Sequence, residues 1–204
     1  MRSIIRFVSL AAFLLLPSIV MSADLQKGLD AFSVGDYATS LAECQPLADE
    51  GNVEAQFCVG RLYANGFGVA MDDALSLKWY GLAAAGGHAE AQYCLGVMHA
   101  NGWGVKMNDV PAAGFYRLAA EQGFSAAQSA LGYSYKHGAG VEESMASAFM
   151  WFDIAAQRGD LSAATERDSL EEKMTQDELV SARRSALQWL EGFEGSAMHA
   201  DLTE

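Results

Sequence analysis

The sequence predicts an all-α fold, an α/α solenoid (superhelix) in which antiparallel helix pairs stack one after another. A pattern in residues 91–126 recurs 36 residues earlier and 36 residues later. Residue types that begin helices and glycines that end them recur at the same spacing. Self-similarity at a period of about 20 to 50 residues is typical of stacked units that cannot bury their apolar faces alone.

The second helix of each unit, helix B, is predicted from the residues at its two ends. N-cap residue types recur at its start, at Asp36, Asp72, Asn108 and Ser144. Their side-chain oxygens can accept from free backbone N–H groups, which stabilises a helix by about 1 kcal/mol. Glycines that can adopt a left-handed conformation recur at its end, at Gly51, Gly87, Gly123 and Gly159. Helix B is therefore predicted at about 72–86, 108–122 and 144–158, and Pro111 lies in a first turn, where it is tolerated.

The preceding helix A contains a glycine in each repeat, at Gly60, Gly96 and Gly132. A glycine inside a helix costs up to about 1 kcal/mol relative to alanine. We expect close approach of the neighbouring helix to compensate, with Ala83, Ala119 and Ala155 as the small residues facing these glycines. The segments at 65–69, 101–105 and 137–141 read NGFGV, NGWGV and HGAGV and are predicted to be turns from helix A to helix B.

These motifs resemble the Sel-like repeat (SLR), a relative of the tetratricopeptide repeat. The resemblance rests on LG followed by an aromatic residue, then G-x-G-V, an N-cap residue and W-Y-x-x-A-A-x-x-G, and it covers residues 55–162 as three full repeats. His99 departs from it, because the equivalent positions hold Tyr63 and Tyr135. The resemblance implies right-handed stacking of helix pairs, a concave face, protein interaction as the usual function and no catalytic residue.

Residues 1–23 are predicted to be a signal peptide. They contain, in order, Arg2, Arg6, an apolar run at 7–16, Pro17 and a cleavage site after Ser22 or Ala23. The run is shorter than the ~20 apolar residues that a membrane span needs, which disfavours a membrane anchor. We therefore expect a periplasmic or secreted protein with no stable membrane insertion after cleavage.

The remaining chain divides at the repeat boundaries. The predicted units are an N-terminal capping half-repeat at 24–54, repeats at 55–90, 91–126 and 127–162, charged C-terminal capping helices at 163–194 and a flexible tail at 195–204. Thr175 and Glu178 form a predicted capping box at the start of the last helix. Polar terminal helices cover the apolar ends of a solenoid.

The charge balance excludes one class of partner. Residues 1–23 carry two of the 13 Lys and Arg and no acidic residue, so the formal net charge changes from −13 to −15 after cleavage. Such a charge repels nucleic acid and attracts basic surfaces. The acidity has two interpretations, solubility alone or attraction of a basic protein partner.

No residue pattern predicts catalysis, a metal site or a cofactor. His88, His99, His137 and His199 lack zinc-ligand spacing, and the repeated G-x-G loops join two helices instead of following a strand. The aromatic pairs of helix B are predicted to be core because they recur at one helical phase: Trp79 and Tyr80, Phe115 and Tyr116, Trp151 and Phe152.

The cysteines can be sorted by their distance from a turn. Cys44 lies seven residues before Gly51 and Cys58 lies seven residues after it, so both are level across one helical hairpin. We predict a Cys44–Cys58 disulfide in an oxidising compartment, with three reduced core cysteines as the alternative. Cys94 is the repeat-equivalent of Cys58, but its hairpin partner is Tyr80, so it is predicted to be a free buried thiol.

The binding face is predicted from helix phase. Val59, Leu95 and Leu131 mark the buried stripe of helix A, so residues about 200° away cannot pack on their own helix B and should face the groove. The predicted site consists of Phe57, Arg61, Tyr93, Val97, Ser129, Tyr133 and Lys136, flanked by Ala64 and Ala100. Tyr and Arg are enriched among binding hot spots.

Two functions from different classes are therefore considered. The first is an exported, non-enzymatic scaffold that binds a protein partner on its concave face, such as a periplasmic regulator, inhibitor or immunity protein. The alternative is a small cell-envelope hydrolase or ligand-binding protein that uses the concave groove.

Overall fold

The computed structural model describes residues 24–200, with side chains up to Phe193, and the predicted signal peptide lies outside this range. The described chain is all-helical, with ten helices and no strand, as predicted. They are α1 (Leu25–Ser33), α2 (Tyr37–Asp49), α3 (Val53–Asn65), α4 (Asp73–Ala85), α5 (Ala89–Asn101), α6 (Asp109–Glu121), α7 (Ser125–His137), α8 (Met145–Gln157), α9 (Leu161–Glu171) and α10 (Gln176–Ala200).

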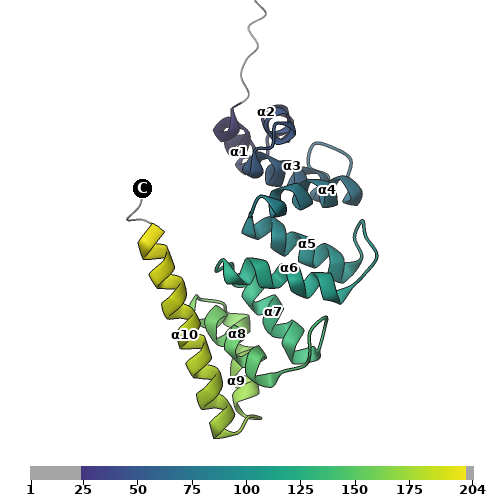
Figure 1. Ribbon diagram of the computed structural model, residues 1–204. Helices are drawn as coiled ribbons and strands as arrows, with labels where there is room; N and C mark the ends of the chain where they lie inside the picture. Colours follow the sequence, from purple (N-terminus) through teal and green to yellow (C-terminus); the bar gives the residue numbers. More distant parts are fainter. Residues whose placement is uncertain (1–23, 201–204) are drawn as a thin grey trace, which may run out of the picture.

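The helices form an extended array of antiparallel pairs, in which each helix up to α9 packs mainly on the helices before and after it (Figure 1). Odd-numbered helices are the helices A and even-numbered ones the helices B. α10 instead packs on α8 and runs back alongside the array. The 36-residue repeat of the sequence is therefore a repeat of one helical hairpin in space.

The predicted ends of helix B are confirmed. Asp72 accepts from the Leu75 N–H at 2.9 Å and Ser144 from the Ser147 N–H at 3.2 Å, whereas Asn108 accepts from the N–H two residues ahead, at Val110. Gly51, Gly87, Gly123 and Gly159 all have positive φ, between 84° and 96°, directly after the C-caps. Pro111 is the third residue of α6.

The two glycines of each G-x-G turn have separate roles. The first ends helix A in a left-handed conformation, as Gly102 does with φ 74°. The second lies against the start of the preceding helix B, where a Cβ at Gly104 would come within 2.6 Å of the Asp73 carbonyl oxygen. The turn therefore also packs one repeat on the next.

The glycines inside helix A make room for aromatic rings. The side-chain atoms nearest to Gly60, Gly96 and Gly132 belong to Tyr80, Tyr116 and Phe152, so the predicted role of the alanines needs correction. Ala83, Ala119 and Ala155 are fully buried. Of the aromatic pairs, Phe115 and Tyr116 are half-buried, whereas the other four rings are buried.

A buried glutamine links each helix A to the preceding helix B. Gln56, Gln92 and Gln128 donate through Nε2 to the carbonyl oxygens of Ala48, Ala84 and Ala120, each at 3.2 Å. These carbonyls lie at helix C-termini and each also accepts from the N–H of the glycine that follows the C-cap. The glutamines therefore give these carbonyls a second donor and link successive repeats.

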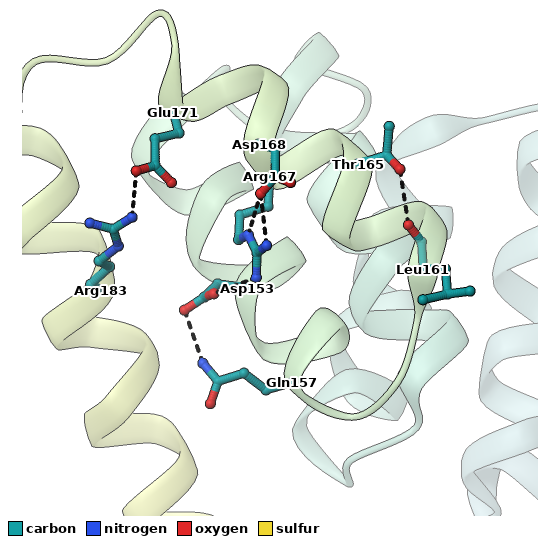
Figure 2. A network of polar contacts seen from close by, with 8 residues as sticks. All are labelled: Asp153, Gln157, Leu161, Thr165, Arg167, Asp168, Glu171 and Arg183. Atoms are coloured by element: carbon teal, nitrogen blue, oxygen red, sulfur yellow. Dashed lines mark hydrogen bonds and ion pairs between the residues drawn. The ribbon is translucent and has the colours of Figure 1, made fainter.

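The C-terminal pair is joined to the array by charged side chains (Figure 2). Arg167 of α9 donates to Asp153 of α8 at 3.4 Å, and Arg183 of α10 donates to Glu171 at 2.7 Å. The predicted capping box is present, with the Thr175 N–H donating to Glu178 at 2.9 Å. These contacts attach α9 and α10 at the end of the repeats.

The last helix is longer than predicted. The tail was expected to begin at residue 195, whereas α10 continues to Ala200. Residues 195–200 contain no proline and include two alanines and a methionine, which are good helix formers. Residues 201–204 of the predicted tail lie outside the described range.

Candidate partner-binding face

Three cavities lie between successive helices A, and we call the surface that they share the helix-A face. The first lies between α1 and α3, the second between α3 and α5, and the third between α5 and α7. Their volumes are about 530, 350 and 300 Å³, respectively. The helices B close them from behind through residues such as Tyr80 and Tyr116.

The second cavity contains most of the predicted residues of the first two repeats. Arg61, Tyr93 and Val97 line it and are half-buried. Arg61 also borders the first cavity, so it lies between the two. The structure therefore brings these three side chains together along one face.

Phe57 also borders this cavity, but it lies mainly in the core. It is 4% exposed and stacks on the His88 ring with centroids 4.2 Å apart. The expectation that it would face an open groove considered only its own helix B. The next repeat covers this side of α3, because His88 begins α5.

The predicted residues of the third repeat are engaged within the chain. Ser129 donates to Asp160 at 2.5 Å, Tyr133 donates to Glu166 at 3.2 Å, and Lys136 forms an ion pair with the same Glu166. Asp160 and Glu166 belong to the N-cap and body of α9. This terminal helix therefore covers much of the surface that α7 was expected to offer.

Hydrogen bonding explains how these acids remain charged. The Ser129 hydroxyl and the Ala163 N–H lower the pKa of Asp160. The Lys136 ammonium lowers the pKa of Glu166. Both carboxylates are thus stabilised in their ionised form by the contacts that attach α9 to α7.

Trp103 also lines the second cavity, but the prediction from the helical phase of helix A did not include it. It lies in the turn after α5, borders the second cavity and is 50% exposed. Its equivalent in the first repeat, Phe67, stacks on Tyr37 with ring centroids 4.5 Å apart, whereas the repeat-equivalent of Tyr37 next to the second turn is Asp73, which offers no ring. The sequence contains one signal that could have identified Trp103: Asp73 stands at the position where the preceding unit has the aromatic Tyr37.

The three cysteines are free thiols in this structure. Cys44 and Cys58 are buried, hydrogen-bonded to one another and close to Ser40. This pairing raises the pKa of Cys44 well above its usual range and lowers that of Cys58 to about 7. The Cys44–Cys58 bridge stays a prediction for oxidising conditions. Burial raises the pKa of Cys94 to about 11, and its thiol hydrogen bonds with Tyr80, its predicted neighbour.

The histidines of the described chain have structural contacts. His88 caps α5 by accepting from the Ala91 N–H at 3.2 Å, and its Nε2 faces Glu54 at 3.2 Å. His99 stacks on Phe115 and His137 on Tyr133. Within residues 24–193 no group of three potential metal ligands comes together. No helix in the described part of the chain is long and apolar enough to cross a membrane.

An all-α array of stacked hairpins is the architecture of the helical-repeat class of proteins. A family model described as "Sel1 repeat" matches residues 53–88, 89–124 and 125–160. The chain therefore belongs to the Sel1 repeat family. These repeats begin two residues before the boundaries drawn from the sequence, so each starts with α3, α5 or α7.

Two solved structures have a similar fold. A Sel1 repeat protein from Oxalobacter formigenes is 30% identical with a TM-score of 0.68, over 71% of this chain and 59% of that one. The protein c5321, described as a protective antigen present in uropathogenic Escherichia coli strains and displaying an SLR fold, is 27% identical with a TM-score of 0.59, over 87% and 49%. This chain thus spans about half of each structure's length. No curated protein matches it.

Proposed function

We propose that this protein is an exported, non-enzymatic scaffold that binds a protein partner along the helix-A face, and that this face is the concave side of the array. The observation that carries the proposal is the grouping of Arg61, Tyr93 and Trp103 around one cavity. Tyr, Trp and Arg are the side chains most enriched among binding hot spots. The partner would occupy the surface between the two capped ends of the solenoid.

Within this class, a periplasmic regulator, inhibitor or immunity protein fits the acidic composition. The net charge of −13 for the full chain attracts basic surfaces and accelerates association with them. The apolar export segment supports a periplasmic or secreted location. Mass spectrometry of the protein from a periplasmic fraction should give a chain beginning at Ala23 or Asp24, and an uncleaved chain in the cytoplasm would contradict export.

A ligand-binding protein is the second candidate, because about 350 Å³ lies within the range of small-molecule sites. A hydrolase is less well supported. Ser76 Oγ donates to the Met98 sulfur at 3.9 Å, and the raised pKa of Cys94 keeps that thiol protonated. The described residues that line this cavity include no histidine to activate either group.

Site-specific photo-crosslinking tests the scaffold. A photoreactive residue at Val97, which lines the second cavity, should give one discrete adduct with a protein in cells. The matched control is Leu118 of α6, which is exposed on a helix B and lines none of the three cavities. Equal adducts at both positions, or none at Val97, would contradict binding on the helix-A face.

A further inference from the structure

The second cavity contains charged groups of both signs that the protein itself does not pair. Arg61, Asp73 and Glu90 all line it. In residues 24–193, none of the three side chains forms an ion pair or a hydrogen bond with another side chain or with the backbone. A charge that becomes buried without a partner is costly, so whatever covers this cavity must supply the missing partners.

Arg61 is held in place by rings and not by acids. Its guanidinium lies 4.1 Å from the Phe32 ring centroid and 5.6 Å from that of Phe57. These contacts place the guanidinium over the Phe32 ring, and within residues 24–193 its N–H donors have no acceptor. Other cations of this acidic chain do have carboxylate partners, as Lys27 has Glu43 and Lys136 has Glu166. Arg61 is thus a positioned and unsatisfied donor group on the helix-A face.

The two acids lie on the opposite helices of the same cavity. Asp73 and Glu90 are in the first turns of α4 and α5, where the helix dipole favours a negative charge. Glu54, the repeat-equivalent of Glu90, faces His88, but Glu90 has no such neighbour. A purely acidic segment placed on Arg61 would therefore also meet these two carboxylates.

The cavity also has an apolar and aromatic lining. Tyr93 and Val97 line it from α5, and the half-exposed indole of Trp103 borders it from the following turn. Since Trp103 has no ring partner among the described residues, its face is available for stacking. Aromatic stacking contributes about 0.5–1.5 kcal/mol beyond the burial of area.

We propose that this cavity receives an amphoteric segment of the protein partner, with an acidic residue on Arg61, an apolar or aromatic residue against Tyr93 and Trp103, and a basic residue facing Asp73 and Glu90. Charge complementarity selects this occupant. An all-basic segment would leave Arg61 unpaired, and an all-acidic one would leave Asp73 and Glu90 opposed by like charges. The inference rests on the proposed scaffold function and specifies the partner's chemistry.

Selection from a displayed library of short random peptides tests this specificity on the full chain. Peptides that carry an acid and a base around an apolar residue should be enriched about tenfold over the unselected library. Selection on Arg61→Ala should lose the enriched acid, and selection on Asp73→Asn/Glu90→Gln should lose the enriched base. Arg184→Ala, which removes an exposed arginine of α10 and changes the net charge equally, should leave the enrichment intact.

Each outcome has a defined meaning. No enrichment, or enrichment of all-basic peptides that Arg61→Ala does not alter, would overturn the proposal. Because Arg61 packs on Phe32, unfolding temperatures must accompany the selections, and the Asp73→Asn/Glu90→Gln variant decides independently if Arg61→Ala is unstable. If the Val97 crosslink forms but the selected peptides show no charge preference, this inference alone is refuted. If no crosslink forms at Val97, the scaffold function is refuted.

Discussion

The Tyr80 ring lies directly on Gly60, so that a Cβ added at Gly60 would come within 2.6 Å of Tyr80 Cδ1. The same relationship joins Gly96 to Tyr116 at 2.4 Å. Real Cβ atoms do not approach other atoms this closely, so a methyl group here must displace a packed ring. The glycine column is therefore the space that the aromatic column of helix B occupies.

Gly96→Ala is expected to destabilise the protein by about 1–3 kcal/mol through overpacking, although alanine is the better helix former. Gly114→Ala is the matched control in the same repeat, since no atom lies within 4 Å of its added Cβ. That change should stabilise α6 by up to about 1 kcal/mol. Urea unfolding measures both, and a stabilised Gly96→Ala variant would show that Tyr116 moves away freely.

Gln92→Met should cost more stability than Gln128→Met, by about 1 kcal/mol. Both glutamines donate to a helix C-terminal carbonyl, but Gln92 Oε1 also accepts from Gln122 at 2.7 Å. Gln128 Oε1 is buried without a partner in the described structure, so its removal relieves a desolvation cost. Thermal unfolding of the two variants gives the difference, and equal losses would mean that Gln128 Oε1 has a partner in solution.

The predicted Cys44–Cys58 bridge should stabilise the oxidised protein by about 3 kcal/mol relative to the reduced one. Alkylation of the unfolded, unreduced chain should then modify one thiol, that of Cys94, and Cys58→Ser should raise the number to two. Three modified thiols in the protein from an oxidising compartment would eliminate the bridge. Both cysteines belong to one buried cluster at the N-terminal end of the array, which places the two thiols in the same part of the core.

Attachment of α9 should weaken in acid. The pKa values of Asp160 and Glu166 are lowered below 3.8 and 4.5 in the folded state, so each carboxylate contributes stability above its unfolded-state pKa and loses it as the pH falls through the folded value. The stability from these contacts should therefore be unchanged from neutral pH to about pH 5 and should be lost as the pH falls below about 4. Glu166→Gln should reduce this pH dependence, whereas Glu142→Gln, at an exposed position, should not. Thermal unfolding followed by far-UV circular dichroism, repeated across this pH range, measures the difference.

Much of the fold could be predicted because its signals are local. A cap such as Asp72 bonds three residues ahead, and a glycine such as Gly87 ends the helix immediately before it, so both can be identified without knowing the neighbouring helices. Recurrence of these signals every 36 residues then predicts stacked hairpins. The buried stripe at Val59 and Leu131 follows from the same periodicity.

Contacts between repeats decide which residues of the candidate site remain accessible. The helical phase within one repeat carries no information about these contacts. Phase predicted Phe57 and Ser129 on the groove side, but α5 buries the first and the cap of α9 binds the second. The exposure of the Trp103 ring depends on the residue that its turn packs against. That residue is Asp73, which lies 30 positions earlier in the chain.

The sequence by itself determined the helices, their ends and their pairing, since each of these depends on residues a few positions apart. Tertiary structure alone decided which groove residues remain available, because burial depends on the side chains of the next helix pair. Arg61 illustrates both: its helical phase placed it on the helix-A face, whereas only the structure shows that its guanidinium packs on Phe32 of the preceding helix pair. A stacked array buries or exposes each face through its neighbours, and that information is not local in the chain.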